Sequence, residues 1–408
     1  MSLAGKLALS LFMGKFFALS ALGLYGLAFG AVMLAVVGFG FRVDYGVSRE
    51  ILGMESSRQR RVGTEVAILF LLSFLIAGPF VLLGFALFGT DDFKLALLIY
   101  LLCGLEAYAN FLYTVTIALR RAALANALFF IRSGAWTLPV MVISYFEPQH
   151  RTVGFVLGWW LAGVSASLLL NIWCMRRALI GPVTWVSFKV REVRDFCRSA
   201  LLIWIGSVAI TMGAYLDRFV LASFLTLQDV GVITFYTSFT TAALTLVQSA
   251  TTSVTFPAMI ERFDADDQRG FRREVLRTTL LALAIGFVIL AGLGTAMPLM
   301  GSVLGKPELL AAYPAFVLLL VATLVRIVGE TLYYGLFVQR QHRAIWGGNF
   351  LFFAVSLLFN LLLVPALGLV GVGIAAILAA AVIAGFRAIA YIHPGYAKGE
   401  VRGKQIAS

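Results

Sequence analysis

A few charged residues in a largely apolar sequence are the groups best suited to do chemistry. Arg132 lies in the apolar segment 122–145, about ten residues from its nearer end. An arginine in the middle of a membrane span is costly unless it faces water or a partner, so it indicates a functional position. Its guanidinium can bind phosphate through two parallel hydrogen bonds. We predict that Arg132 binds an anionic group of a substrate; a structural ion pair with Glu106, at similar depth in segment 94–118, is the alternative.

Three further cations are candidates for the same anion-binding role. Arg326 lies four residues before Glu330, on the same helical face, so the two can also neutralise each other in a purely structural pair. Arg218 lies near the outer end of its segment and could instead extend its head group to the membrane surface. Its neighbour Asp217 points about 100° away on a helix, so only one of them faces a cavity squarely. Lys15 is the weakest candidate.

Three carboxylates could couple transport to an ion. Burial favours the protonated form of a carboxyl group, so Glu106, Asp217 or Glu330 could take up a proton on one side of the membrane and release it on the other. Each could equally be a fixed counter-ion. We expect H+ or Na+ to drive transport, with no bound cofactor.

A polar stripe runs through the segment 230–257. Its members recur at steps of three and four residues, which places them on one face of a continuous helix. They are Thr234, Ser238, Thr241, Thr245, Gln248, Thr252 and Thr255. Glu106, Asn110 and Tyr113 form a shorter stripe that we expect to face the same space. Such surfaces either line a sugar-compatible cavity or form hydrogen bonds between helices.

The elements that must position these groups are membrane-spanning helices. Of the 408 residues, 61% are apolar and only 13% are charged, and the mean hydropathy is +0.95, so the bilayer is the solvent. A span needs roughly 20 apolar residues. We predict an all-α polytopic membrane protein of about twelve helices, over 3–19, 22–41, 63–89, 94–118, 122–145, 152–174, 199–222, 230–257, 278–300, 312–338, 345–364 and 370–391.

The first of these segments is unusual. Only eight uncharged residues separate Lys6 from Lys15. We expect a shortened or tilted span whose lysines extend to the surfaces, or a chain whose true start lies upstream.

Basic residues set the orientation. With the amino terminus inside, the inner segments hold 23 lysines and arginines and the outer loops hold Lys94, Arg151 and Lys306. This bias predicts that both termini are cytoplasmic. The formal net charge of +12 therefore reflects topology and contact with anionic membrane lipids, and we expect no nucleic-acid partner.

The sequence carries no pattern typical of catalysis. His150, His342 and His393 are scattered, too far apart in sequence for a metal site or a triad. The outer loops leave no room for a catalytic domain, and the P-loop pattern of nucleotide-driven transporters is absent. We expect neither an enzyme nor a metal protein.

A repeat divides the chain in two. Residues 16–24 (FFALSALGL) match residues 224–232 (FLTLQDVGV) at an offset of 208, in both cases at an outer turn between spans. Six spans separate the copies, so the halves share one orientation and should be related by a pseudo-twofold along the membrane normal, with the substrate path between them. We predict an N-terminal six-helix bundle over 1–174, a cytoplasmic amphipathic linker over 175–198 and a C-terminal bundle over 199–408.

Several stretches together resemble one family. They are residues 22–27 (LGLYGL), 37–52 (with VGF, DY and SREIL), 215–220 (YLDRFV), 230–232 (VGV) and 365–375 (PALGLVGVGIA). Their order along both halves is similar to that of the Wzx-type polysaccharide flippases, in the superfamily that also holds MATE drug antiporters and lipid II flippases.

This resemblance implies a function. The chain would translocate an oligosaccharide repeat unit linked to undecaprenyl pyrophosphate from the inner to the outer leaflet of a bacterial inner membrane, for O-antigen or exopolysaccharide synthesis. Alternating access about a central cationic cavity would be the mechanism, and a polysaccharide polymerase and a chain-length regulator are candidate partners. A MATE-like, cation-coupled exporter of small drugs is the alternative, but the arginines Arg132 and Arg326 argue against the acidic cavity that cationic drugs would prefer.

Overall fold

The chain folds into α-helices throughout its described part. The computed structural model describes residues 2–42, 55–87, 92–179 and 190–393, together with positions 44, 47 and 51. No strand occurs in these ranges. Eleven of the described helices are long and apolar enough to cross a membrane. The predicted fold class, an all-α polytopic membrane protein, is therefore confirmed.

The first predicted span differs from the others. It forms α1 (Ser2–Phe16), whose 15 residues rise only about 22 Å at 1.5 Å per residue. It is accordingly not among the eleven helices of spanning length.

The helices gather into two compact units, Met1–Thr211 and Met212–Ser408. The division lies inside α9 (Val190–Phe224), so this helix contributes to both. In the first unit the Trp204 indole donates to the Gly38 carbonyl over 3.0 Å, and in the second the Ser356 hydroxyl donates to the Gly213 carbonyl over 3.1 Å. Of the predicted linker 175–198, the ends belong to helices and residues 180–189 lie outside the described residues.

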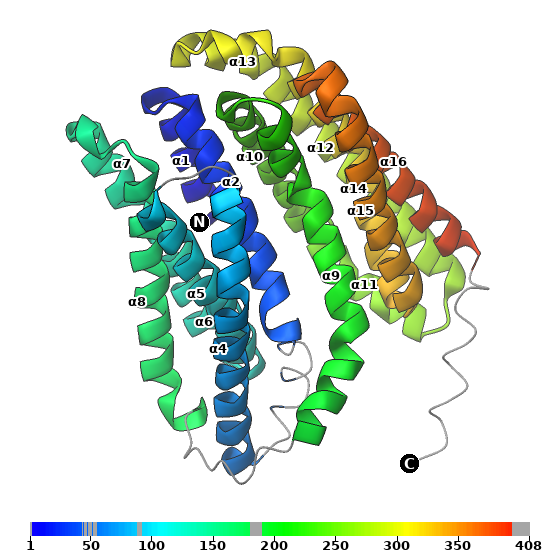
Figure 1. Ribbon diagram of the computed structural model, residues 1–408. Coiled ribbons are helices and arrows are strands. Elements are labelled where there is room, and N and C mark those ends of the chain that lie inside the picture. The colour runs from blue at the N-terminus through cyan, green and yellow to red at the C-terminus, as the bar shows by residue number, and fades with distance from the viewer. Residues whose placement is uncertain are drawn as a thin grey trace. The chain divides into compact units, whose positions relative to one another are not determined.

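The first unit contains the helices up to the start of α9, labelled in Figure 1. Here α5 contacts α2, α4 and α8 and so lies at its centre. The predicted span over 122–145 is one of the eleven, and it consists of three consecutive pieces, α6, η3 and α7. The bounds are α2 (Leu19–Gly38), η1 (Phe39–Arg42), α4 (Ser56–Leu87), α5 (Phe93–Ala118), α6 (Ala122–Phe130), η3 (Ile131–Ala135), α7 (Thr137–Phe146), η4 (Pro148–His150) and α8 (Val153–Leu179).

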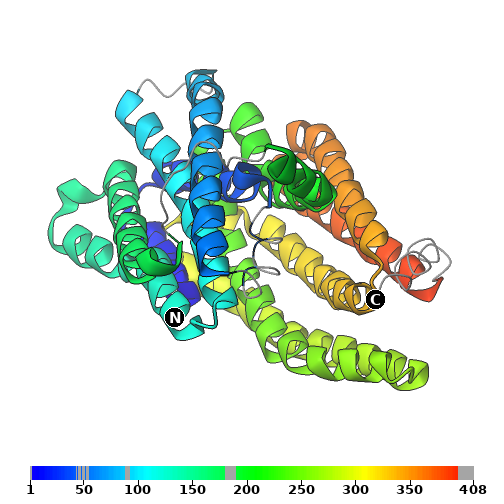
Figure 2. The same cartoon turned by 90° about the horizontal axis from the view of Figure 1, so that it is seen from below.

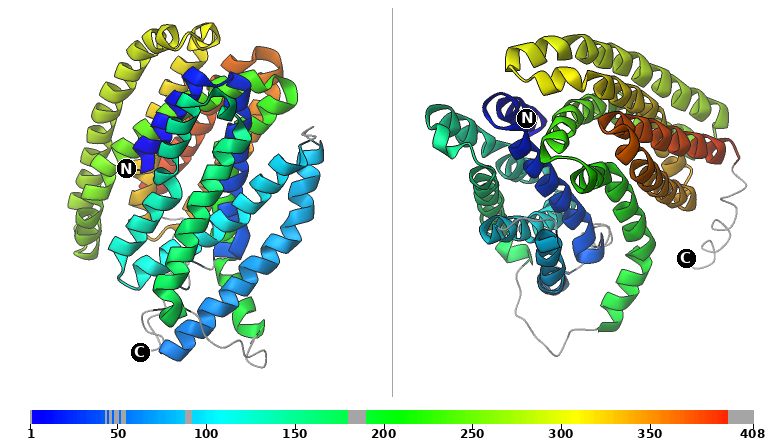
Figure 3. Two further views of the ribbon diagram at one scale, coloured as in Figure 1. Left: turned by 90° about the vertical axis from the view of Figure 1, so that its left-hand side faces the viewer. Right: turned by 45° about the horizontal axis from the view of Figure 1, so that its top comes forward.

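The second unit is built around α14 and α16. Helix α16 packs against both α14 and α15, and Figure 2 shows α15 and α16 side by side in orange and red. Figure 3 shows α12 as a long, gently curved helix. The bounds are α10 (Leu227–Ala250), α11 (Thr252–Asp264), α12 (Gln268–Leu304), α13 (Pro307–Ala311), α14 (Tyr313–Val338), α15 (His342–Leu367) and α16 (Leu369–Ile392).

Large apolar side chains remain exposed on most of these helices. On α12 they recur over most of its length: Leu276, Leu280, Phe287, Val288, Leu299 and Val303. A water-soluble protein rarely exposes so continuous an apolar surface. We therefore place this face against lipid.

Two joints between helices repeat in the two units. Helices α1 and α9 end at Phe16 and Phe224, and the next helices begin at Leu19 and Leu227, both at an offset of 208. Helices α5 and α14 are each 26 residues long and end in a turn with an arginine of left-handed backbone, Arg120 at φ 60° and Arg340 at φ 59°. The local architecture thus follows the sequence repeat.

Candidate functional site

A π-helical segment places Arg132 inside the first unit. Residues 131–135 form the π-helix η3 between α6 and α7. Single π turns within α-helices are often found at functional sites. Pro139 follows in α7, and because proline has no N–H it cannot donate to the carbonyl four residues earlier, which favours an irregular turn here. The predicted span 122–145 is present as Ala122–Phe146, with this π turn inside it.

Side chains satisfy the backbone carbonyls in and beside this turn. The hydroxyl of Ser133 donates to the carbonyl of Phe129 (2.6 Å), and the hydroxyl of Thr137 to that of Gly134 (2.7 Å). The Trp136 indole donates to the carbonyl of Arg132 over 3.0 Å. Irregular backbone at membrane depth persists only where such donors satisfy it. The π turn is therefore built into the local sequence.

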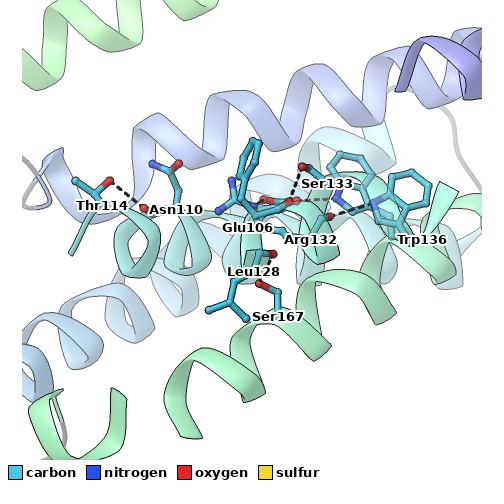
Figure 4. Close-up of polar contacts among 10 residues, drawn as sticks. Glu106, Asn110, Thr114, Leu128, Arg132, Ser133, Trp136 and Ser167 are labelled. Carbon is cyan, nitrogen blue, oxygen red and sulfur yellow. Dashed lines mark hydrogen bonds and ion pairs between the residues drawn. The ribbon is translucent and has the colours of Figure 1, made fainter. Parts of the chain in front are cut away.

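Arg132 forms a buried ion pair with Glu106 of α5. Figure 4 shows the two side chains pointing toward one another. The Nε–Oε2 distance is 2.8 Å, and the side chains are 9% and 4% exposed. The other carboxylate oxygen accepts a 2.6 Å hydrogen bond from the indole of Trp160 on α8. The structural ion pair, which was the alternative interpretation of Arg132, is thus present. The Nη1 of Arg132 remains buried without a hydrogen-bond partner among the described residues.

Lys6 lies beside this pair. Its ammonium is 5.1 Å from the centre of the Phe29 ring and interacts electrostatically with both Glu106 and Arg132. Gly5, the preceding residue, lies against η3, where an added Cβ would be 3.1 Å from the Thr137 hydroxyl. Lys6 is therefore a half-buried residue beside the Glu106–Arg132 pair. Lys15, by contrast, is exposed near the end of α1, 5.7 Å from the Phe16 ring.

A second charged cluster joins α14, α15 and α16. The predicted pair is present, with Arg326 Nε 3.7 Å from Glu330 Oε1, and its side chains are 35% and 20% exposed. Arg387 of α16, which the sequence analysis did not single out, lies 3.8 Å from the same carboxylate oxygen and is 2% exposed. It donates to the carbonyl of Gly329 (2.9 Å) and to the amide oxygen of Asn349 (3.1 Å). Its sequence signal was weak because it lies close to the inner end of its segment.

Arg218 is buried on α9 and does not extend to the surface. It is 6% exposed, its Nη2 donates to the Thr237 hydroxyl over 2.9 Å, and its Nε and Nη1 have no hydrogen-bond partner in the described part of the chain. Its guanidinium lies 5.0 Å from the Tyr215 ring centre. Asp217 accepts a 2.9 Å hydrogen bond from the Arg218 backbone N–H and interacts electrostatically with that arginine.

The polar stripe is not continuous. The helix breaks at Thr251, where φ is −116° and ψ is −74°, so Thr252 and Thr255 belong to α11 and the rest to α10. Within α10, the hydroxyls of Ser238 and Thr245 donate to carbonyls of their own helix, both at 2.8 Å. Thr241 is exposed, Gln248 is half-buried, and the hydroxyl of the buried Thr234 has no hydrogen-bond partner within the described ranges.

The shorter stripe on α5 is divided between two environments. Asn110 and Tyr113 are half-buried, unlike Glu106, which is buried. The Tyr113 hydroxyl donates to the Asn126 amide oxygen on α6 over 3.4 Å. These side chains are thus available to polar ligands, whereas Glu106 is held in its ion pair.

The charged groups described above give each unit an excess of positive charge. Lys6 and Arg132 lie with one carboxylate, Glu106. In the second unit and the end of α9 that joins it, three arginines, Arg218, Arg326 and Arg387, share two carboxylates, Asp217 and Glu330. Over the ranges that the structure describes, no group of three metal-ligating side chains occurs. This arrangement is suited to bind anions through guanidinium groups.

Known proteins share this fold. No protein-family model and no curated protein matches the sequence. Among solved structures, an inward-facing multidrug resistance MATE family transporter of the MOP superfamily is similar with a TM-score of 0.75 and 15% identity, over 98% of this chain and 96% of its own. The lipid II flippase MurJ is similar with a TM-score of 0.75 and 11% identity, over 96% and 86%.

A point mutant of the Vibrio cholerae MATE transporter VcmN is also similar, with a TM-score of 0.63 and 15% identity, over 96% of this chain and 92% of its own. All three are membrane transporters or flippases by name. The chain therefore has the fold that MATE transporters and the MurJ flippase share.

Proposed function

We propose that this chain is a flippase that moves an undecaprenyl-pyrophosphate-linked oligosaccharide repeat unit from the inner to the outer leaflet. The observation that carries the proposal is the excess of cations over carboxylates among the charged groups described in the spanning helices of each unit. Unneutralised charge inside a membrane protein is costly and marks the path of a charged substrate. A pyrophosphate group supplies the missing negative charge.

The geometry of the arginines supports phosphate as the ligand group. Arg132, Arg218 and Arg387 are each at least nine-tenths buried, and each retains at least one guanidinium nitrogen without a hydrogen-bond partner among the residues described. An unsatisfied buried donor costs about 1–3 kcal/mol. Phosphate oxygens accept such donors in short, charge-assisted bonds. Substrate binding would thus compensate a cost already present in the free protein.

The fold supports a lipid-linked substrate without specifying it. MurJ, a lipid II flippase, shares the architecture over nearly the whole chain. Sugar contacts are assigned to the half-buried Asn110, Tyr113, Ser238 and Gln248 and to the exposed Thr241.

Export of small cationic drugs is the second candidate, because a multidrug MATE transporter is equally similar in fold. Such a substrate would need unpaired carboxylates. Glu106 and Glu330 are instead each paired with arginine. The charge balance therefore favours an anionic substrate.

Coupling to H+ or Na+ is assigned to Asp217. Of the three candidate carboxylates, Glu106 and Glu330 lie within 4 Å of arginine nitrogens, whereas Asp217 accepts a bond from a backbone N–H. A carboxylate held less firmly by a cation can exchange its ion more readily. Asp217→Asn should abolish stimulation of transport by a proton or sodium gradient while leaving exchange without a gradient intact.

A test in cells uses the pool of undecaprenyl-pyrophosphate-linked oligosaccharide. Deletion of the gene should cause this lipid to accumulate, and wild type should reverse the accumulation. Arg218→Gln should fail to reverse the accumulation. Arg269→Gln, which removes an exposed arginine at the start of α12, should reverse it as wild type does. An unchanged lipid pool together with new sensitivity to cationic dyes would instead support the drug exporter.

A further inference from the structure

The cluster around Glu106 contains two cations and one carboxylate. Arg132 lies 2.8 Å from Glu106, and Lys6 interacts electrostatically with both residues. Glu106 also accepts the indole hydrogen bond of Trp160, so both of its oxygens already have partners. An ammonium ion in an apolar interior needs a counter-ion to remain charged. Glu106 neutralises one of the two cations, and the described residues supply no ion-pair partner for the other.

Lys6 belongs to α1, whose first residue, Ser2, it follows by four residues. A chain of contacts ties it to the cluster: its ammonium faces Phe29, the Phe29 ring lies 5.8 Å from that of Trp160, and Trp160 donates to Glu106. These contacts place Lys6 beside the cluster.

We infer that Lys6 and Arg132 together form a binding site for one phosphate-class anion, with Glu106 as the internal competitor for Arg132. The identity of the ligand as a lipid-linked pyrophosphate rests on the proposed function, but the site itself does not. The donors are the ammonium of Lys6 and the buried Nη1 of Arg132, which no described residue engages in a hydrogen bond. Lys6 is a residue that sequence reasoning placed at a membrane surface.

The competition follows from the contacts of Glu106. Its Oε2 pairs with the Nε of Arg132. This nitrogen is one of the two parallel donors with which a guanidinium binds phosphate. An anion that takes this donor must displace the carboxylate. Removing the negative charge of Glu106 should therefore strengthen anion binding, whereas a purely structural role for Glu106 predicts weaker binding.

The test is binding of two probes, undecaprenyl pyrophosphate and inorganic pyrophosphate, to the full chain in lipid nanodiscs. Lys6→Gln should weaken binding roughly tenfold to a hundredfold, the range that one charge-assisted hydrogen bond gives. Lys6→Arg should retain most of it. Lys94→Gln is the control; because Lys94 is exposed at the start of α5, binding should not change. Glu106→Gln should bind more tightly than wild type.

Each outcome decides between alternatives. Equal loss of both probes in Lys6→Gln supports a general phosphate site, and loss of the lipid probe alone supports a site for the carrier lipid. Unchanged binding in Lys6→Gln, or weaker binding in a correctly folded Glu106→Gln, overturns the inference. If Glu106→Gln does not fold, the comparison of Lys6→Gln with Lys94→Gln still decides.

The same assay separates this inference from the proposed function. If the wild-type protein binds pyrophosphate through Lys6 but does not flip the lipid-linked oligosaccharide, the binding site is supported and the proposed function is wrong. If the wild-type protein flips the lipid and Lys6→Gln binds both probes normally, the proposed function is supported and the site at Lys6 is wrong.

Discussion

At the scale of single residues, the account depends on how buried charges are compensated. Arg132 was predicted as a substrate ligand on its depth alone, and the structure shows that Glu106 occupies one of its donors. A buried pair is weak evidence for net stability, but breaking it leaves an uncompensated charge. Binding and folding effects at this position must therefore be measured separately.

The first prediction concerns this pair. Glu106→Gln should lower the free energy of unfolding by about 3–5 kcal/mol, because the buried Arg132 is left without its anion. The double variant Glu106→Gln/Arg132→Gln should recover most of the loss. Thermal unfolding in detergent measures both, with Lys15→Ala as an exposed control expected within about 0.5 kcal/mol of wild type. Additive effects of Glu106→Gln and Arg132→Gln, measured singly and together, would show that the pair is not coupled.

The second prediction compares two arginines that share Glu330. Arg387 is 2% exposed and bonds the Gly329 carbonyl and Asn349, so Arg387→Ala should cost about 3 kcal/mol. Arg326 is 35% exposed, and water screens its pair, so Arg326→Ala should cost less than about 1 kcal/mol. Unfolding of the two variants under one condition tests the order. A larger cost for Arg326→Ala would contradict it.

At the scale of elements, the arginine that pairs with Glu106 lies within the π turn. A π turn holds one residue more than a turn of α-helix. The extra residue rotates the helix after the turn by about 100° relative to the helix before it. Ser133, Trp136 and Thr137 satisfy carbonyls at this turn. The element is thus held by side-chain donors that a regular helix does not require.

The third prediction tests those donors. Thr137→Val removes the 2.7 Å bond to the Gly134 carbonyl and should cost about 1–3 kcal/mol, because a buried acceptor loses its partner. Thr279→Val removes a similar 2.8 Å bond to the Val275 carbonyl within the regular helix α12, and should stay within about 0.5 kcal/mol of wild type. Thermal unfolding gives both values. Equal costs would mean that the π turn needs no special support.

Much of the fold followed from hydrophobic length alone, because helices α5, α8, α14 and α16 begin and end within a few residues of the predicted spans. The breaks in two spans did not follow from hydrophobic length. The π turn in 131–135 and the break at Thr251 depend on local backbone geometry, which leaves the hydrophobic pattern unchanged. The predicted stripe failed for this reason, since it assumed one straight helix.

The candidate site was only partly predictable. The Arg326–Glu330 pair followed from helical spacing, whereas the roles of Lys6 and Arg387 depend on contacts with other helices. Both residues lie near the ends of their predicted segments, where a charge is ordinarily explained by the membrane surface. Spacing along one helix does not show which other helices a residue contacts. Only these contacts distinguish a charge at the membrane surface from a charge held inside the protein.

At the scale of the whole molecule, the two units repeat their helices but not their charges. The 26-residue helices α5 and α14 correspond at an offset of 220, which matches Glu106 with Arg326 and Asn110 with Glu330. The first unit therefore takes its cations from α1 and η3, and the second from α9, α14 and α16. Each unit nevertheless keeps an excess of positive charge among these groups.

The most direct measurement is transport by the purified protein in proteoliposomes that contain undecaprenyl-pyrophosphate-linked oligosaccharide on one leaflet. A membrane-impermeant enzyme or lectin reports its arrival on the other leaflet, and a cationic dye is tested in parallel vesicles. The account predicts transfer of the lipid-linked oligosaccharide, strongly reduced in Arg218→Gln and normal in Arg269→Gln, with no dye transport. Dye transport without transfer of the lipid-linked oligosaccharide would contradict it.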